Sequence, residues 1–352
     1  MNLSARCLLL PLLFATTAVA EPPTWPDPAA IDGFVLEMED RHAYPAARLR
    51  ELFGEMRPNE VVLRAIAPPT DPRVKSWERY RARFLNRKRI DDGVAFWARH
   101  EKALARAEAD FGVPSAIVVA IIGVETEYGR NTGRFGTFEA LATLAFAYPP
   151  RAPFFRRELE EFLVLARDNG LDVTGVKGSF AGAIGIPQFM PGSQRRYAVD
   201  FDGNGRIDLQ HSVEDAIGSV ARFLKLHGWI AGGPIAEPVS RTLEVRAEWV
   251  EAGIKPTLER DALAAAGIDA SAQPHAHPAA LIDLVTPDRD TEYWWGYANF
   301  YAITRYNRSS FYAMSVAQLA EAIERRHQTG RAGLASRRAV KGGYPARRHP
   351  SG

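Results

Sequence analysis

The sequence predicts a mainly helical protein of the α+β type with one small β-containing unit. Apolar residues recur at helical spacing over much of residues 29–228 and again over 315–326. Between these stretches, residues 237–285 contain short strand-like runs, at 243–245 and 281–285, beside an alanine-rich patch. The 352 residues, 46% of them hydrophobic, suffice for two or three structural units.

Residues 1–20 are predicted to be a signal peptide. They contain Arg6, an almost wholly apolar stretch over residues 8–18 and a small-x-small cleavage signal at residues 18–20. The apolar stretch is short for a membrane span, although an uncleaved anchor stays open as the alternative. The one cysteine, Cys7, lies in this leader, so we expect an exported, periplasmic protein without disulfides.

The N-terminal helical stretch, residues 29–100, is interrupted once. Residues 67–72 read Ala-Pro-Pro-Thr-Asp-Pro, and such a segment cannot be helical because proline lacks an amide hydrogen and restricts the residue before it. A helix is then predicted over residues 101–111, and Gly112 ends it.

An apolar helix is predicted next, over residues 115–128. Pro114 precedes it, as is common at helix starts, and Gly129 ends it. The remaining predicted elements are helices over residues 137–148, 154–169, 212–227 and 315–326, with glycine-rich loops at 178–193 and 200–206.

The basic residues gather at the C-terminal end of the chain. Residues 331–352 hold six Lys and Arg and no acid, within a formal net charge of +2 for the whole chain. Without leader and tail the body carries a net charge of −5, which argues against a nucleic-acid partner. The tail is predicted to be disordered and solvated, with peripheral contact to an anionic envelope polymer or membrane as the alternative.

Glu125 is the candidate general acid. Ile121, Ile122 and Val124 precede it and supply apolar surroundings, which disfavour a charged carboxylate. The carbonyl end of the helix acts in the same direction. A carboxyl that stays protonated near neutral pH can donate its proton to an ether-like oxygen.

Two nearby glutamates have simpler explanations. Glu127 would point away from the helix face of Glu125, so it is interpreted as a structural or solvated charge rather than a second proton-transfer group. Glu139 lies in the first turn of its predicted helix, where a negative charge interacts favourably with the helix dipole.

Residues 200–208 match the first nine positions of a calcium-binding loop. Oxygen donors and a glycine at the sixth position suit Ca²⁺ rather than a transition metal. The twelfth position is His211 instead of the usual glutamate. An Asx-turn loop without a metal is the alternative.

Three separated motifs together resemble the lytic murein transglycosylase B family. They are Gly-Val-Glu-Thr-Glu-Tyr-Gly at 123–129, Ser-Phe-Ala-Gly-Ala-Ile-Gly-Ile-Pro-Gln-Phe-Met-Pro at 179–191 and Thr-Arg-Tyr-Asn at 304–307. The resemblance covers about residues 30–328. It implies a lysozyme-like core and cleavage of peptidoglycan between N-acetylmuramic acid and N-acetylglucosamine without added water, leaving 1,6-anhydro ends.

The same resemblance implies roles for individual residues. Glu125 would act as the single acid and base, and Ser179 and Gln188 would flank it, bind substrate and orient its carboxyl. Tyr306, Asn307 and Tyr312 would line the substrate groove. A longer calcium loop, closed by a later acid, would take its ligands from Asp200, Asp202, Asn204, the Arg206 carbonyl and Asp215 (less readily Glu214).

The predicted organisation follows from these assignments. No organic cofactor is expected, the calcium would be structural, and a monomer acting on peptidoglycan strands is expected. A muramidase-type hydrolase on the same scaffold and a non-catalytic peptidoglycan-binding protein remain as alternatives. The predicted units are the signal peptide (1–20), an N-terminal helical domain (29–112), a lysozyme-like core (113–230), a β-containing insertion (235–290), a return to the core and helical domain (291–328) and a basic tail (329–352).

Overall fold

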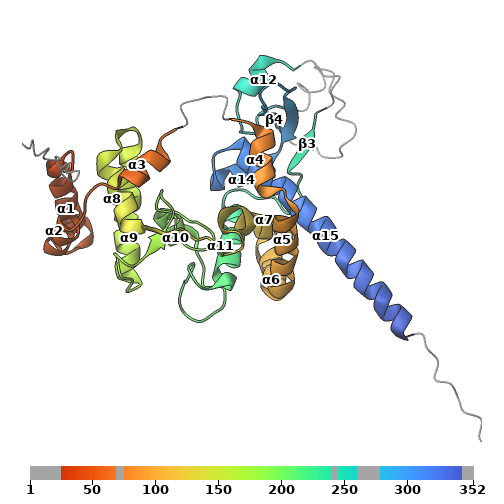
Figure 1. The fold of residues 1–352 in the computed structure, drawn as a ribbon, viewed down its shortest axis with the longest axis horizontal. Helices are drawn as coiled ribbons and strands as arrows, with labels where there is room; N and C mark the ends of the chain where they lie inside the picture. The colour runs from red at the N-terminus through yellow and green to blue at the C-terminus, as the bar shows by residue number, and fades with distance from the viewer. Residues whose placement is uncertain (1–24, 69–74, 240–244, 260–277, 343–352) are drawn as a thin grey trace, which may run out of the picture. The chain divides into compact units, whose positions relative to one another are not determined.

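The computed structural model describes residues 25–68, 75–239, 245–259 and 278–342 (Figure 1). The chain forms two compact units, one ending at Pro58 and one beginning at Asn59. The predicted signal peptide lies outside the described residues. The described residues are mainly helical, as the sequence predicts, and form two small sheets; only the sheet within residues 235–296 corresponds to the predicted β-containing unit.

The first unit packs α1 (Pro28–His42) against α2 (Ala46–Gly54). Asp27 caps the start of α1, where its side chain accepts a hydrogen bond from the amide of Ala30 at 3.0 Å. The apolar residues that follow helical spacing are buried in both helices, namely Phe34, Met38, Leu49, Leu52 and Phe53.

The second unit begins with four helices that precede the predicted catalytic core. They are α3 (Glu60–Ile66), α4 (Trp77–Phe84), α5 (Arg87–Arg99) and α6 (Glu101–Phe111). α6 ends at Gly112 in the left-handed conformation, which confirms the predicted stop. These helices share one compact unit with the core, whereas the sequence places them in a domain over residues 29–112. The other predicted domain limits stay predictions.

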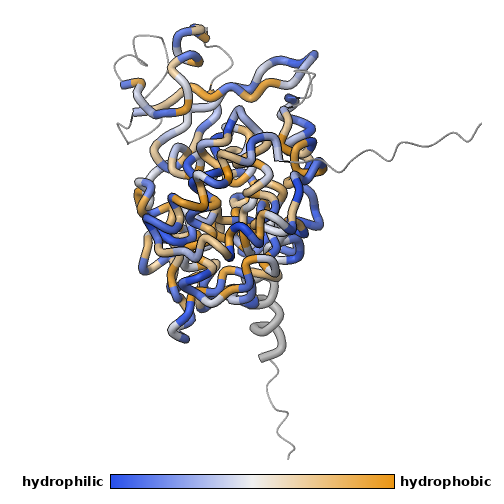
Figure 2. Tube along the Cα trace, turned by 90° about the vertical axis from the view of Figure 1, so that its left-hand side faces the viewer, coloured by the Kyte–Doolittle hydropathy of each residue, from blue (hydrophilic) through white to orange (hydrophobic). Residues whose placement is uncertain are grey.

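The centre of this unit is α7 (Ser115–Thr126), in which all residues from Ser115 to Gly123 are buried. α5, α6, α11 and α15 all contact it. The elements that follow it in the chain are β1 (Phe135–Gly136), α8 (Thr137–Ala147), a 3₁₀ turn (Pro149–Arg151), α9 (Ala152–Asp168), β2 (Lys177–Gly178), α10 (Pro191–Tyr197) and α11 (Val213–Leu226). Figure 2 shows hydrophobic and hydrophilic residues interspersed along the trace of the chain.

The small β-containing unit is an antiparallel sheet in the order β3–β5–β4. Its strands are β3 (Ala236–Pro238), β4 (Ala280–Leu284) and β5 (Glu292–Gly296), and α12 (Ala247–Glu251) contacts β4. The strand predicted at 281–285 is confirmed, whereas the one at 243–245 lies largely outside the described residues. β5 extends the sheet past residue 290, and its Trp295 is buried.

Two helices complete the unit, α14 (Ala298–Tyr306) and α15 (Ser310–Gly342). The sequence predicts the last helix only over 315–326 and a disordered tail from residue 331. In the structure α15 instead continues unbroken to Gly342 (Figure 1). Residues 329–342 contain several good helix formers and no proline, which permits this extension.

Among the described residues no single helix is both long enough and apolar enough to span a membrane. α6 and α7 taken together, bent by 114°, pass this test by length and composition.

Candidate active site

Glu125 lies in the last turn of α7, but the helix ends differently from the prediction. It stops at Thr126 rather than continuing to Tyr128. Glu127, Tyr128 and Gly129 then follow with φ values of +53°, +64° and +84°. The predicted helix end is wrong because two non-glycine residues, Glu127 and Tyr128, enter the left-handed region before Gly129.

Glu125 is a partly buried residue, and its carboxyl has one hydrogen-bond partner among the described side chains. The hydroxyl of Tyr312 donates to Oε1 at 2.6 Å. Burial raises the pKa of Glu125 to about 7, and the hydrogen bond from Tyr312 acts against this rise. The structure therefore gives Glu125 the elevated pKa that its apolar sequence context predicts.

Tyr312 and Tyr306 form a stacked pair behind this carboxyl. Their ring centroids are 6.3 Å apart, with an interplanar angle of 13°. Tyr312 is 2% exposed, so it supports Glu125 from inside rather than forming an open groove wall as the resemblance implied. The hydroxyl of Tyr306 donates to the carbonyl of Pro187, and Asn307 lies exposed at the end of α14.

The loop over residues 179–190 is braced by its own polar side chains. The hydroxyl of Ser179 accepts hydrogen bonds from the amides of Ala181 and Ala183, at 3.3 and 3.1 Å. The side-chain amide of Gln188 donates to the carbonyls of Thr132 and Gly185, at 2.9 and 2.8 Å. Within the described part of the chain neither side chain bonds to Glu125. The structure therefore does not support the prediction that Ser179 and Gln188 orient the carboxyl of Glu125; the hydroxyl of Tyr312 bonds to this carboxyl instead.

The glycines of this loop serve protein packing. A Cβ on Gly182 would meet the side chain of Leu141, and one on Gly185 would meet the backbone of Leu209. The loop is also fixed to the end of α7, because the hydroxyl of Thr126 donates to the carbonyl of Ile186 at 2.8 Å.

Tyr80 on α4 is a neighbour of Glu125 that sequence reasoning missed. Burial raises the pKa of Tyr80, and the nearby charge of Glu125 raises it further. Its ring packs against Phe84 and Phe311 and the residue is partly buried, while its hydroxyl has no hydrogen-bond partner among the described residues. Nothing local marks this tyrosine, since an aromatic residue on a helix is usually core.

The predicted calcium loop brings three carboxylates together. Ligand oxygens of Asp200, Asp202 and Asp215 all lie within 4.8 Å of one another. Asp215 is fully buried, and it accepts hydrogen bonds from the backbone amides of Phe201 (2.7 Å), Asp202 (3.2 Å) and Asp208 (2.8 Å). Converging carboxylates and a loop of oxygen donors fit a hard cation such as Ca²⁺.

The other members of the predicted ligand set lie on the same loop. The side-chain oxygen of Asn204 accepts from the amide of Arg206 at 2.9 Å. Asp208 stands apart from the carboxylate cluster, because its side chain contacts the imidazole of His211 at 3.0 Å. His211 at position twelve is thus explained as the partner of Asp208.

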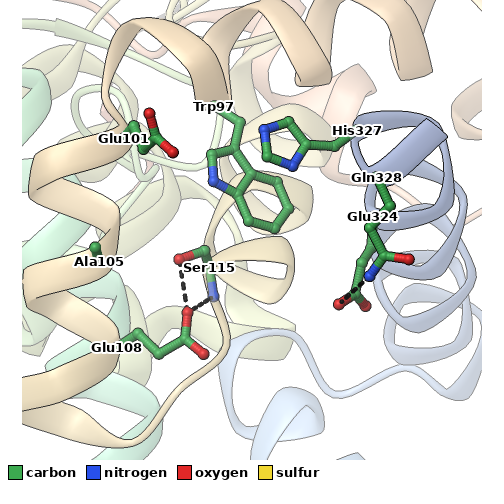
Figure 3. A pocket seen from close by; sticks show the side chains of 8 residues that line it. All are labelled: Trp97, Glu101, Ala105, Glu108, Ser115, Glu324, His327 and Gln328. Atoms are coloured by element: carbon green, nitrogen blue, oxygen red, sulfur yellow. Dashed lines mark hydrogen bonds between the residues drawn. The ribbon is translucent and has the colours of Figure 1, made fainter. Parts of the chain in front are cut away.

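A separate hollow of about 380 Å³ lies between α5, α6 and α15 (Figure 3). Trp97 and His327 stack there with ring centroids 4.4 Å apart, and Glu108 accepts hydrogen bonds from Ser115. None of the residues predicted to be functional lines it. The group around Glu125 therefore remains the candidate active site.

Comparison with known proteins identifies relatives of this chain. A family model described as "Transglycosylase SLT domain" matches residues 27–321. The membrane-bound lytic murein transglycosylase B of Escherichia coli K12 is 42% identical over 299 residues, which are 82% of this chain and 81% of that protein.

Solved structures agree with this match. The soluble lytic transglycosylase SltB1 from Pseudomonas aeruginosa is 45% identical, with a TM-score of 0.76 over 85% of this chain and 99% of that one. The Escherichia coli lytic transglycosylase Slt35, solved in complex with calcium, is 39% identical, with a TM-score of 0.76 over 87% of this chain and 96% of that one.

Proposed function

Because this chain belongs to the lytic murein transglycosylase family, we propose that Glu125 is the single catalytic carboxyl of its peptidoglycan cleavage. The observation that carries the assignment is the carboxyl of this partly buried residue, which accepts a hydrogen bond from Tyr312 and whose pKa is raised to about 7 by burial. Such a group is protonated often enough to act as an acid, and ionised readily enough to act next as a base.

The reaction needs two proton transfers by the same carboxyl. Protonated Glu125 gives its proton to the oxygen that links C1 of N-acetylmuramic acid to the next sugar, and that C1–O bond breaks. The C6 hydroxyl of the same muramic acid then attacks C1, and the Glu125 carboxylate takes the hydroxyl proton. The products are a 1,6-anhydro end and a sugar with a free hydroxyl, so Glu125 ends protonated as it began.

The surroundings of Glu125 support this route over hydrolysis. A glycosidase that activates water usually has a second carboxylate across the sugar from the acid. Glu127 is engaged with Arg89 at 3.0 Å, and no other carboxylate among the described residues is a cause of the raised pKa of Glu125. An attacking hydroxyl supplied by the substrate removes the need for that second group.

Substrate contacts and location are further parts of the proposal. Ser179, Gln188, Tyr306 and Asn307, with the free hydroxyl of Tyr80, would contact the glycan around Glu125. Calcium at Asp200, Asp202, Asn204, Arg206 and Asp215 would brace the loop without entering the chemistry. Since the substrate lies outside the cytoplasmic membrane, the chain would act in the periplasm after export through residues 1–20.

Product analysis tests the reaction type. Peptidoglycan sacculi digested with the protein are expected to yield muropeptides that end in 1,6-anhydro-muramic acid, each lighter by one water than a reducing-end product. Mass spectrometry of the digest measures this difference. Reducing ends would establish a muramidase, and an unchanged sacculus would establish a binding protein without turnover.

Removing the hydroxyl of Tyr312 should change the pH dependence of cleavage. The acid must be protonated, so wild-type activity is expected to fall as pH rises through about 7. Tyr312 stabilises the ionised carboxylate, hence Tyr312→Phe should raise the pKa of Glu125 further and move this fall to higher pH. We expect the maximal rate to drop about tenfold, because the carboxyl loses its orienting bond.

Tyr306→Phe is the matched control for this pH profile. The hydroxyl of Tyr306 bonds to the carbonyl of Pro187 rather than to Glu125. Removing it should therefore leave the fall in activity at the wild-type pH. A profile of Tyr312→Phe that stays in place, or moves to lower pH, would contradict the role given to this hydrogen bond. Initial rates on soluble glycan chains between about pH 5 and 9 cover the expected range.

A further inference from the structure

The C-terminal end of α7 is held from outside by Arg89 of α5. One guanidinium nitrogen of Arg89 donates to the carbonyl of Gly123, and another donates to Oε1 of Glu127 at 3.0 Å. The backbone carbonyl of Arg89 in turn accepts a hydrogen bond from the hydroxyl of Tyr128 at 2.7 Å. We call these three residues, Arg89, Glu127 and Tyr128, the α7-end clamp.

The clamp keeps the backbone in a conformation that its residues do not favour. Glu127 and Tyr128 have φ values of +53° and +64°, which side chains other than glycine rarely adopt. Such conformations persist where surrounding contacts over-determine them, and they cluster at functional sites. The clamp provides contacts of this kind directly after the helix.

Two glycines make room for the tyrosine of the clamp. A Cβ on Gly123 would lie 2.7 Å from the ring of Tyr128, and a Cβ on Gly93 would lie 2.6 Å from its hydroxyl. The ring therefore fits between α5 and α7 only because both positions lack a side chain. α5 and the end of α7 are thus matched to each other around Tyr128.

Glu125 lies between the two points on which Arg89 acts. Gly123 precedes it by two residues and Glu127 follows it by two, and both are bonded to the same guanidinium group. The carboxyl of Glu125 itself is bonded on its other side to Tyr312 of α15. Backbone and carboxyl of the acid are consequently fixed by two separate elements.

We propose that Arg89 and Glu127 are positioning residues for catalysis by Glu125. The inference rests on the proposed function, in which Glu125 transfers the protons. The Arg89 side chain is 12% exposed and the Glu127 side chain 45% exposed, and each is bonded to the other. They act through the backbone of α7, which sets where the Glu125 carboxyl meets the glycosidic oxygen. Glu127 has no proton-transfer step of its own.

Three substitutions separate the hydrogen bonds of the clamp from its charges. Glu127→Gln removes the charge but keeps an oxygen that can accept from Arg89. Glu127→Ala removes charge and acceptor together. Arg89→Lys keeps the charge but loses the planar fork that reaches Gly123 and Glu127 at once.

Steady-state kinetics on soluble glycan chains is the measurement. Glu127→Gln should keep kcat within about threefold of wild type, while Glu127→Ala and Arg89→Lys should lose about 10- to 100-fold in kcat with KM within about threefold. The double variant Arg89→Lys/Glu127→Ala should be no worse than the poorer single variant, because both break one unit.

Several results would overturn the inference. A kcat near wild type for Glu127→Ala or Arg89→Lys would show that the clamp does not position the acid. Equal and large losses in Glu127→Gln and Glu127→Ala would point to the charge of Glu127 instead. If Glu127→Ala does not fold, the contrast between Arg89→Lys and Glu127→Gln still decides, with thermal unfolding confirming that both are folded.

Failure of the proposed function would look different. Glu125→Gln is measured in the same assay, and an active Glu125→Gln enzyme would remove Glu125 from the reaction whatever the clamp variants do. An inactive Glu125→Gln beside fully active clamp variants would overturn the positioning role alone.

Discussion

Replacing Glu125 with glutamine is expected to lower peptidoglycan cleavage by about three powers of ten or more. Glutamine has nearly the same shape and can still accept the hydrogen bond from Tyr312, but it cannot donate an acidic proton or take one back. Binding of isolated sacculi should stay near wild type, since the side chains around Glu125 are unchanged. Turbidity loss of a sacculus suspension and a pull-down of the protein with sacculi measure the two quantities.

Glu139→Gln is a suitable control for this substitution. Glu139 lies in the first turn of α8 and accepts a hydrogen bond from the side chain of Asn59 at 3.1 Å, a bond that glutamine can also accept. Its cleavage activity should remain close to wild type. Substantial activity in Glu125→Gln would reject Glu125 as the acid, and loss of sacculus binding would mean that the substitution also disturbs its surroundings.

Part of the site could be predicted because its signal is local in the sequence. The apolar run before Glu125 indicates a buried carboxyl, and its pKa of about 7 follows from that burial. The oxygen-rich loop after residue 200 is a local pattern too, and its carboxylates do converge with Asp215. In both cases neighbouring residues along the chain create the environment that matters.

The partners of these groups could not be predicted because they come from distant parts of the chain. Tyr312 is 187 residues away from Glu125, and Arg89 is 38 residues away from Glu127. Only packing of α4, α5 and α15 around α7 brings these side chains to the acid. The family resemblance implies that Tyr312 lines the groove. Its hydrogen bond to Glu125 depends on the packing of α15 against α7, which the sequence does not reveal. Tyr80 had no signal at all.

The end of α7 shows why helix stops are also hard to predict. Glycine after a helix is a reliable stop signal, and Gly129 does adopt a positive φ. The helix nevertheless ends earlier, because Glu127 and Tyr128 are drawn into the left-handed region by Arg89 and the glycine-lined space beside α5. A tertiary contact here overrides a local preference.

Calcium is expected to stabilise the protein through the loop that follows the active-site segment. The oxygens of Asp200, Asp202 and Asp215 lie within 4.8 Å of one another, close to the separation of two ligands across one Ca²⁺ ion. A ligand bound only by the folded state at a hundred times its Kd adds about 2.7 kcal/mol to the free energy of unfolding. Thermal unfolding with excess calcium and with chelator should therefore differ by several degrees.

Asp215→Asn should abolish this calcium response and also destabilise the chelated protein by about 3 kcal/mol. The buried side chain accepts three backbone hydrogen bonds, two on one oxygen and one on the other. Asparagine keeps one acceptor oxygen, and its amide nitrogen would face at least one of these donors with a donor of its own. Asp208→Asn is the control, since Asp208 pairs with His211 outside the cluster and should keep the calcium shift. If the wild-type protein unfolds identically with calcium and with chelator, the loop does not bind calcium and is an Asx-turn loop without a metal.

The effect of this loop on catalysis should be indirect and smaller than that of Glu125. The carbonyl of Leu209 accepts a hydrogen bond from the amide of Ile186 at 2.8 Å, and the carbonyl of Ile186 accepts one from Thr126 at the end of α7. A loosened calcium loop can thus disturb the acid only through two intervening contacts. If the Asp215→Asn variant is still folded at the assay temperature, it should keep far more activity than Glu125→Gln, because the carboxyl of Asp215 takes no part in proton transfer.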